Sequence, residues 1–187
     1  MPTPCVLFVP TDQAVRILRR YTLDSTCTTG SIHDAWVPIG TAPLVQTLDG
    51  MIATVHTPDS DPRWPTTCAC GYRFRPSDPW QTIQEPLLVD RYGRTTTTHQ
   101  GSPPPGAMWQ TDYLADLWPG PDGLCLTVIL PSGEPWVIDG PSSHGDGWTR
   151  VGVPPLITVQ PSILTPRYHG WLTDGVLSDD LEGRTYA

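Results

Sequence analysis

Two cysteines of this chain lie one residue apart, at Cys68 and Cys70, and Gly71 follows them. Thiols this close along the backbone cannot form a disulfide of normal geometry, but both can point at one metal ion if the chain turns sharply, as glycine allows. The pair predicts a metal-binding knuckle, and zinc is the metal to test first. Such a knuckle more often supports a loop-rich domain than carries out chemistry.

A tetrahedral zinc ion needs two ligands beyond the cysteine pair. His56 ends a predicted strand that leads into the cysteine loop, so its ring can reach back across the bend at residues 58–65. His33 is followed by Asp34, a carboxylate that can orient a ligating imidazole. We expect His56 and His33 to complete the site, although a lone histidine is more often an ordinary surface or core residue. Further candidate ligands are His169, His144 and Cys27.

The other cysteines carry weaker signals. Cys5 and Cys125 lie within apolar runs, where a thiol behaves as a small hydrophobic group. Cys27 lies in a polar turn and is either an exposed thiol or a third metal ligand. Five cysteines, an odd number, argue against a secreted disulfide framework.

The chain has no motif of a familiar enzyme class. Neither a Gly-rich phosphate loop nor the H-E-x-x-H, G-x-S-x-G or zinc-deaminase signature is present. Asp139 ends an apolar run near His144, and such a pair can act as acid and base, but an aspartate before glycine is far more often a turn residue. We expect a protein that is not an enzyme and has no catalytic residues.

Prolines and glycines interrupt the chain throughout, 23 and 17 of them in 187 residues. Eight tryptophans spread over nearly the whole length predict that it nevertheless folds, because disordered segments are poor in aromatic residues. Short apolar runs alternate with turn residues from residue 35 onward. This pattern predicts a mainly β, loop-rich fold with antiparallel, sandwich-like sheets.

One short helix is predicted near the N-terminus. After a strand at residues 5–9, Thr11 can cap a helix over residues 12–20 whose arginines lie near its end. Hairpin turns are predicted at three places, two of them from Asp-Gly pairs: residues 48–51, 131–134 and 173–175.

The length fits a single domain, residues 1–187. Within it we expect a loop-rich, zinc-knuckle-like segment at residues 56–80, an exposed loop at 93–106 and an extended C-terminal tail at 178–187.

The net charge of −8 repels phosphate, so nucleic acid is not expected as the primary ligand. With no apolar run of eighteen residues and no signal-peptide pattern, we expect a soluble protein made in the cytoplasm, with no membrane partner.

Several motifs together resemble a family of uncharacterised proteins encoded by tailed phages of actinobacteria. They are Met1-Pro2-Thr3-Pro4-Cys5, Asp61-Pro62-Arg63-Trp64-Pro65 with the cysteine knuckle, Gly106-Ala107-Met108-Trp109, Gly120-Pro121-Asp122-Gly123, Trp136-Val137-Ile138-Asp139, Pro161-Ser162-Ile163 and Tyr168-His169-Gly170. The resemblance covers nearly the whole chain. Relatives usually show C-x-x-C-G at the knuckle, and many carry further cysteines after the W-[VI]-[VI]-D segment.

The resemblance implies a non-enzymatic structural protein of the virion. Such a protein is a minor capsid, capsid-stabilising or head-to-tail component that binds the major capsid protein or other phage structural proteins. Rigid, proline-rich arms suit this role because they lose little entropy on binding. The alternative is a free intracellular phage protein, either a zinc-dependent enzyme of unfamiliar type or an inhibitor of a host factor.

Overall fold

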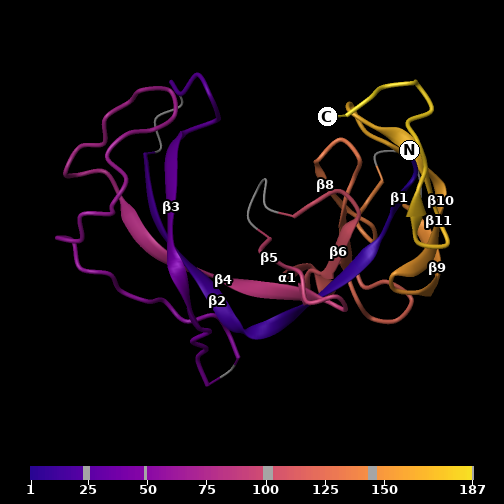
Figure 1. The fold of residues 1–187 in the computed structure, drawn as a ribbon, viewed down its shortest axis with the longest axis horizontal. Helices are drawn as coiled ribbons and strands as arrows, with labels where there is room; N and C mark the ends of the chain where they lie inside the picture. The colour runs from indigo at the N-terminus through magenta and orange to yellow at the C-terminus, as the bar shows by residue number, and fades with distance from the viewer. Residues whose placement is uncertain (23–25, 49, 99–102, 143–146, 187) are drawn as a thin grey trace. The chain divides into compact units, whose positions relative to one another are not determined.

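Strands make up almost all of the regular structure (Figure 1). The structure is a computed structural model that describes residues 1–22, 26–48, 50–98, 103–142 and 147–186. Its elements are β1 (Thr3–Pro4), β2 (Val6–Thr22), β3 (His33–Pro43), β4 (Trp80–Asp90), β5 (Thr95–Thr96), β6 (Ala107–Gln110), α1 (Asp112–Ala115), β7 (Leu126–Ile129), β8 (Pro135–Val137), β9 (Thr149–Val153), β10 (Leu156–Leu164), β11 (His169–Thr173) and β12 (Val176–Leu177). The mainly β prediction is confirmed.

The predicted N-terminal helix is wrong, because residues 12–20 lie within the long strand β2. This strand pairs with β3 on one edge and β4 on the other. Ile17 and Leu18 point to opposite faces of the sheet, and both are buried. A strand buried on both faces produces the same run of apolar residues as one face of a short helix. The Thr11 hydroxyl does accept the N–H of Gln13, as a helix cap would, but the chain stays extended. Helix in the described part of the chain is limited to α1, a single turn.

The described residues group into two compact units, so the single domain expected from the length has two parts. Unit 1 comprises Met1–Val9 and Leu88–Ala187, and unit 2 comprises Pro10–Leu87. The chain passes from unit 1 to unit 2 within β2 and returns within β4. No helix among the described residues is long and apolar enough to cross a membrane.

Unit 1 is built around one large hydrophobic core. Its antiparallel sheet has the strand order β1-β12-β11-β10-β9. Buried side chains of this sheet, such as Ile157 and Leu172, belong to the same core cluster as Met108, Val128 and Trp136 from β6, β7 and β8. Two sheets therefore share this core, and the second is mixed because β2 pairs with β6 in parallel.

Tight turns join neighbouring strands of unit 1 as the sequence predicts. Asp174 and Gly175, between β11 and β12, both have positive φ, which an Asp-Gly turn supplies. Between β7 and β8, the Gly133 N–H donates to the Leu130 carbonyl across the predicted turn. At residues 48–51, Thr47 pairs with Met51 through the backbone, but Asp49 lies outside the described residues.

Two predicted surface segments are held more firmly than expected. In the segment 93–106, β5 pairs with β4 and the side chains of Thr96 and Thr97 are buried; residues 99–102 lie outside the described part. The tail at 178–187 is fixed by Asp180, a buried carboxylate that accepts hydrogen bonds from the His169 N–H and the Tyr186 hydroxyl. Because residues 168–186 are tied together in this way, the tail is part of the folded unit.

A buried cation links three segments of unit 1. The guanidinium of Arg150, whose side chain is 1% exposed, donates to Asp139 at 2.7 Å, to Asp122, and to the Leu124 carbonyl. Asp139 also accepts the Leu126 N–H. Gly120 permits the close approach, because a Cβ there would lie 2.3 Å from a guanidinium nitrogen. Hydrogen bonding to Arg150 lowers the pKa of Asp122.

The described part of unit 2 is not stabilised by a large hydrophobic core of the kind found in unit 1. Both clusters of buried hydrophobic side chains found among the described residues belong to unit 1. Between β3 and β4, the described residues of unit 2 form isolated bridges, such as Gln46 with Ile52, and no extended strand pairing. The buried side chain of Gln84 binds backbone groups there that a neighbouring strand would otherwise bind. It accepts the Val45 N–H and donates to the Ala53 carbonyl. Unit 2 therefore needs a source of stability other than a large apolar core.

We predict that Asp139→Ala lowers the free energy of unfolding by about 3 kcal/mol, because it removes one partner of the buried Arg150. Denaturant unfolding measures the loss. Asp179→Ala is the matched control: this exposed carboxylate pairs with the N-terminal amine at the surface, so its removal should cost less than about 1 kcal/mol. Equal losses in the two variants would contradict this role for Arg150.

Candidate metal centre

Four side chains of unit 2 converge on one point. The sulfurs of Cys27, Cys68 and Cys70 and a ring nitrogen of His33 all lie within 4.8 Å of one another. The Cys27 and Cys68 sulfurs are 3.9 Å apart, and His33 Nδ1 lies 3.1 Å from the Cys70 sulfur. All three thiols are free. This Cys3His cluster could hold a metal ion.

The two cysteines of the C-x-C pair lie in a narrow hairpin. Thr67 and Arg73 form an antiparallel bridge, and the Cys68 N–H donates to the Tyr72 carbonyl at 2.8 Å. The Gly71 N–H then donates back to the Cys68 carbonyl, closing the turn, and Gly71 has a φ of +93°, a conformation that favours glycine. The turn brings both thiols to one side of the hairpin, as the sequence predicts.

His33 is the first residue of β3 and pairs with Thr22 at the end of β2. Its ring stacks on Tyr72 with the centroids 4.1 Å apart and the planes 10° from parallel. Its Nε2 lies 3.2 Å from the Thr26 hydroxyl, which leaves Nδ1 directed at the cysteines. A ligating histidine commonly has its second nitrogen held in this way, so Thr26 and Tyr72 fix the ring before any metal binds.

Charged and aromatic side chains join β2 to this region. The Arg19 guanidinium pairs with Asp34 at 2.7 Å and lies 4.6 Å from the ring centroids of both Tyr21 and Trp36. Arg20 bonds the Arg75 carbonyl and lies over the rings of Phe74 and Trp80. These contacts attach the knuckle hairpin and the start of β3 to the same strand.

The thiols of the cluster differ in acidity. Burial raises the pKa of Cys68, but hydrogen bonds from the backbone N–H groups of Cys70 and Asp34 and from the neighbouring thiols outweigh it and lower that pKa to about 7. Hydrogen bonds from Thr29 lower the pKa of Cys27. At Cys70 a backbone hydrogen bond from Tyr72 lowers the pKa, but burial and the two other thiols raise it above the usual value. Cys68 and Cys27 therefore favour the thiolate, the form that binds metals, whereas Cys70 does not.

The structure thus brings together Cys68, Cys70, His33 and Cys27. His56 is exposed and is not part of the cluster. His169 belongs to unit 1, where it lies 3.5 Å from Glu182, and His144 falls outside the described residues. The loop between β2 and β3 supplies Cys27, a position that the sequence pattern offered only as an alternative.

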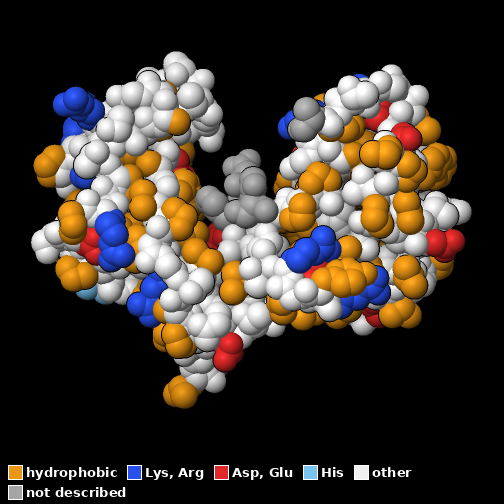
Figure 2. Space-filling view, in the orientation of Figure 1, with side chains coloured by type: hydrophobic (Ala, Val, Ile, Leu, Met, Phe, Trp, Pro, Cys, Tyr) orange, Lys and Arg blue, Asp and Glu red, His pale blue; other side chains and the backbone are white. Residues whose placement is uncertain are grey.

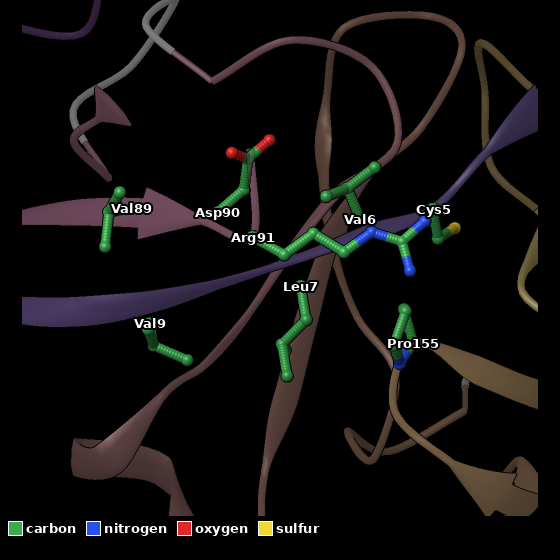
Figure 3. Close-up of a pocket in the computed structure, with 8 residues that line it drawn as sticks. All are labelled: Cys5, Val6, Leu7, Val9, Val89, Asp90, Arg91 and Pro155. Carbon is green, nitrogen blue, oxygen red and sulfur yellow. The ribbon is translucent and has the colours of Figure 1, made fainter. Parts of the chain in front are cut away.

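The remaining predicted sites have structural roles. Cys5 lines a mainly apolar pocket of about 330 Å³ in unit 1, together with Val6, Leu7 and Val89 (Figure 3). Burial raises the pKa of Cys5 to about 12, so this thiol stays protonated and is a poor nucleophile. Asp139 pairs with Arg150, as a structural carboxylate does.

Comparison of the chain with protein-family models, curated proteins and solved structures found no match. Function is therefore argued from the site itself.

We predict that the reduced protein binds one metal ion per chain and that His33→Ala weakens binding by more than about 100-fold, since even loss of a partner that orients a ligand costs roughly 10–100-fold. Metal content after dialysis, measured by mass spectrometry, gives the result. His56→Ala and His169→Ala are the controls and should retain the metal. Loss of metal in either control with retention in His33→Ala would contradict the assignment.

Proposed function

We propose that the Cys3His cluster holds a structural zinc ion. Tetrahedral zinc has Zn–S bonds of about 2.3 Å and Zn–N bonds of about 2.0–2.1 Å, which place ligand atoms roughly 3.5–3.8 Å apart. The separations of 3.9 Å between the Cys27 and Cys68 sulfurs and 3.1 Å between His33 Nδ1 and the Cys70 sulfur lie close to that range. Cysteine and histidine in this ratio are ligands typical of structural zinc sites.

A structural role follows from the number of ligands. Four protein ligands complete a tetrahedron and leave no position for water or substrate, which a catalytic zinc site requires. Two of the four, His33 at 4% and Cys68 at 5% exposed, are also shielded from solvent. The zinc would connect the β2–β3 loop to the knuckle hairpin and so stabilise a unit whose described residues contain no hydrophobic core cluster.

We propose that the chain itself acts by binding other proteins. One face of the sheet β1-β12-β11-β10-β9 packs on the core of unit 1, and the other exposes several apolar side chains: Val151, Val153, Leu156, Trp171 and Val176. Hydrophobic side chains gather over β9, β10 and β11 in Figure 2. This exposed sheet face is the single observation that carries the proposal.

The exposed sheet face has the composition of an interaction surface. Val153 is 77% exposed and lies opposite Leu156 in the neighbouring strand. Its strand positions contain no Asp, Glu, Lys or Arg; they are Pro4, Thr149, Val151, Val153, Leu156, Thr158, Gln160, Leu164, His169, Trp171, Thr173 and Val176. Binding surfaces are depleted of charge at their centre and enriched in aromatic residues such as Trp171.

The resemblance to tailed-phage proteins suggests the partner. We propose a non-enzymatic virion component, made in the host cytoplasm, that binds the major capsid protein or another phage structural protein through the exposed sheet face. A minor capsid, capsid-stabilising or head-to-tail protein fits this description. Binding would bury apolar surface and involve no turnover.

The test is to quantify the chain in purified phage particles by mass spectrometry, relative to the major capsid protein. We predict a fixed ratio for the wild type and a loss of about tenfold or more in Val153→Asp, because a buried unpaired charge is costly in an interface. Leu117→Asp, at a residue of similar exposure away from the sheet face, is the control and should keep the wild-type ratio. Absence of the wild-type chain from particles would overturn the virion assignment.

A further inference from the structure

Two sulfurs of the cluster lie close enough to form a bond with each other. The Cys27 and Cys68 sulfurs are 3.9 Å apart, and a disulfide needs about 2.05 Å, so a movement of about 2 Å would join them. We propose that Cys27 and Cys68 form a reversible disulfide on oxidation by hydrogen peroxide, and that this bond replaces the metal as the cross-link of unit 2. The metal-release part rests on the zinc site proposed above.

Geometry favours this pair over the alternatives. Cys68 and Cys70 are separated by one residue in a tight turn, where a disulfide of normal geometry does not form. The Cys70 sulfur is also engaged by His33 Nδ1 at 3.1 Å. Cys27 comes from a different loop, 41 positions away along the chain, so it approaches Cys68 from across the site.

The exposure of the two cysteines sets the order of the steps. Cys27 is partly exposed, whereas Cys68 is buried at 5%, so a small oxidant reaches Cys27 first. The Cys27 thiolate attacks one peroxide oxygen; the O–O bond breaks, hydroxide leaves and a sulfenic acid forms on Cys27. The Cys68 thiolate then attacks the Cys27 sulfur, forming the S–S bond and expelling a second hydroxide.

The electrons and atoms balance in these two steps. Two thiolates lose two electrons in total, one peroxide molecule gains them, and two protons from solvent convert both hydroxides to water. A metal ion that loses two of its four ligands is released unchanged in oxidation state. Because both cross-links join the β2–β3 loop to the knuckle hairpin, oxidation would exchange one for the other without opening the unit.

The experiment treats reduced, full-length protein with hydrogen peroxide and follows two signals. A colorimetric chelator reports released zinc, and peptide mapping by mass spectrometry identifies any disulfide. We expect a link between the peptides that contain Cys27 and Cys68, formed in step with zinc release and reversed by dithiothreitol. A link between Cys68 and Cys70, or oxidation to sulfinic acid with no link, would overturn the proposal.

Two variants separate the disulfide from the zinc site. Cys70→Ser removes a proposed zinc ligand but leaves the disulfide pair, so it should lose zinc and still form the link. Cys27→Ser should form no intramolecular disulfide. If the reduced wild type contains no zinc yet forms the Cys27–Cys68 link, the proposal of a structural zinc is contradicted and the disulfide proposal is supported. If it contains zinc and forms no such link, the disulfide proposal is contradicted and the zinc proposal is supported.

Discussion

The convergence of three thiols and one imidazole within 4.8 Å is the constraint on which unit 2 depends. Unit 1 folds around a shared core of two sheets, whereas no hydrophobic core cluster is found among the described residues of unit 2. A small unit with little apolar burial usually needs a metal or a disulfide. The four donors come from the β2–β3 loop, the first residue of β3 and the knuckle hairpin, so a single ion would tie these three segments together.

The rest of unit 2 is arranged to hold these donors in place. Tyr72 stacks on His33, Thr26 holds its second nitrogen, and the backbone N–H of Asp34 bonds the Cys68 sulfur. From β2, the Arg19 guanidinium lies over the Trp36 ring and the Arg20 guanidinium lies over the Trp80 ring. Preorganised donors lower the entropy lost on metal binding, and the same closeness of sulfurs permits the disulfide between Cys27 and Cys68.

Local patterns in the sequence predicted local structure well. The C-x-C-G knuckle and the Asp-Gly turn before β12 follow from the geometry of a few neighbouring residues, and both are present. The strand β2 was missed because its extended conformation depends on pairing with β3 and β4, which a local pattern does not contain. Its Val15-Arg16-Ile17-Leu18 run is compatible with either element until those partners are known.

The metal ligands illustrate the same limit. His56 is the histidine nearest to the knuckle along the chain but lies outside the cluster, and Cys27 joins it from 41 positions away because β2 and β3 pair and place their connecting loop beside the hairpin. Arg150 gave no signal in the sequence, since its two aspartates lie 28 and 11 positions away. Contacts of this range depend on the sheet topology, so they emerge only with the fold.

Zinc K-edge X-ray absorption of the reduced protein tests the central claim most directly. We predict a first shell of three sulfurs at about 2.3 Å and one nitrogen at about 2.0–2.1 Å, with no coordinated water. A shell with two sulfurs and two lighter atoms would show that one of the three cysteines is not a ligand, and an exchangeable oxygen would show that the site is open. Either result would contradict a closed Cys3His zinc site.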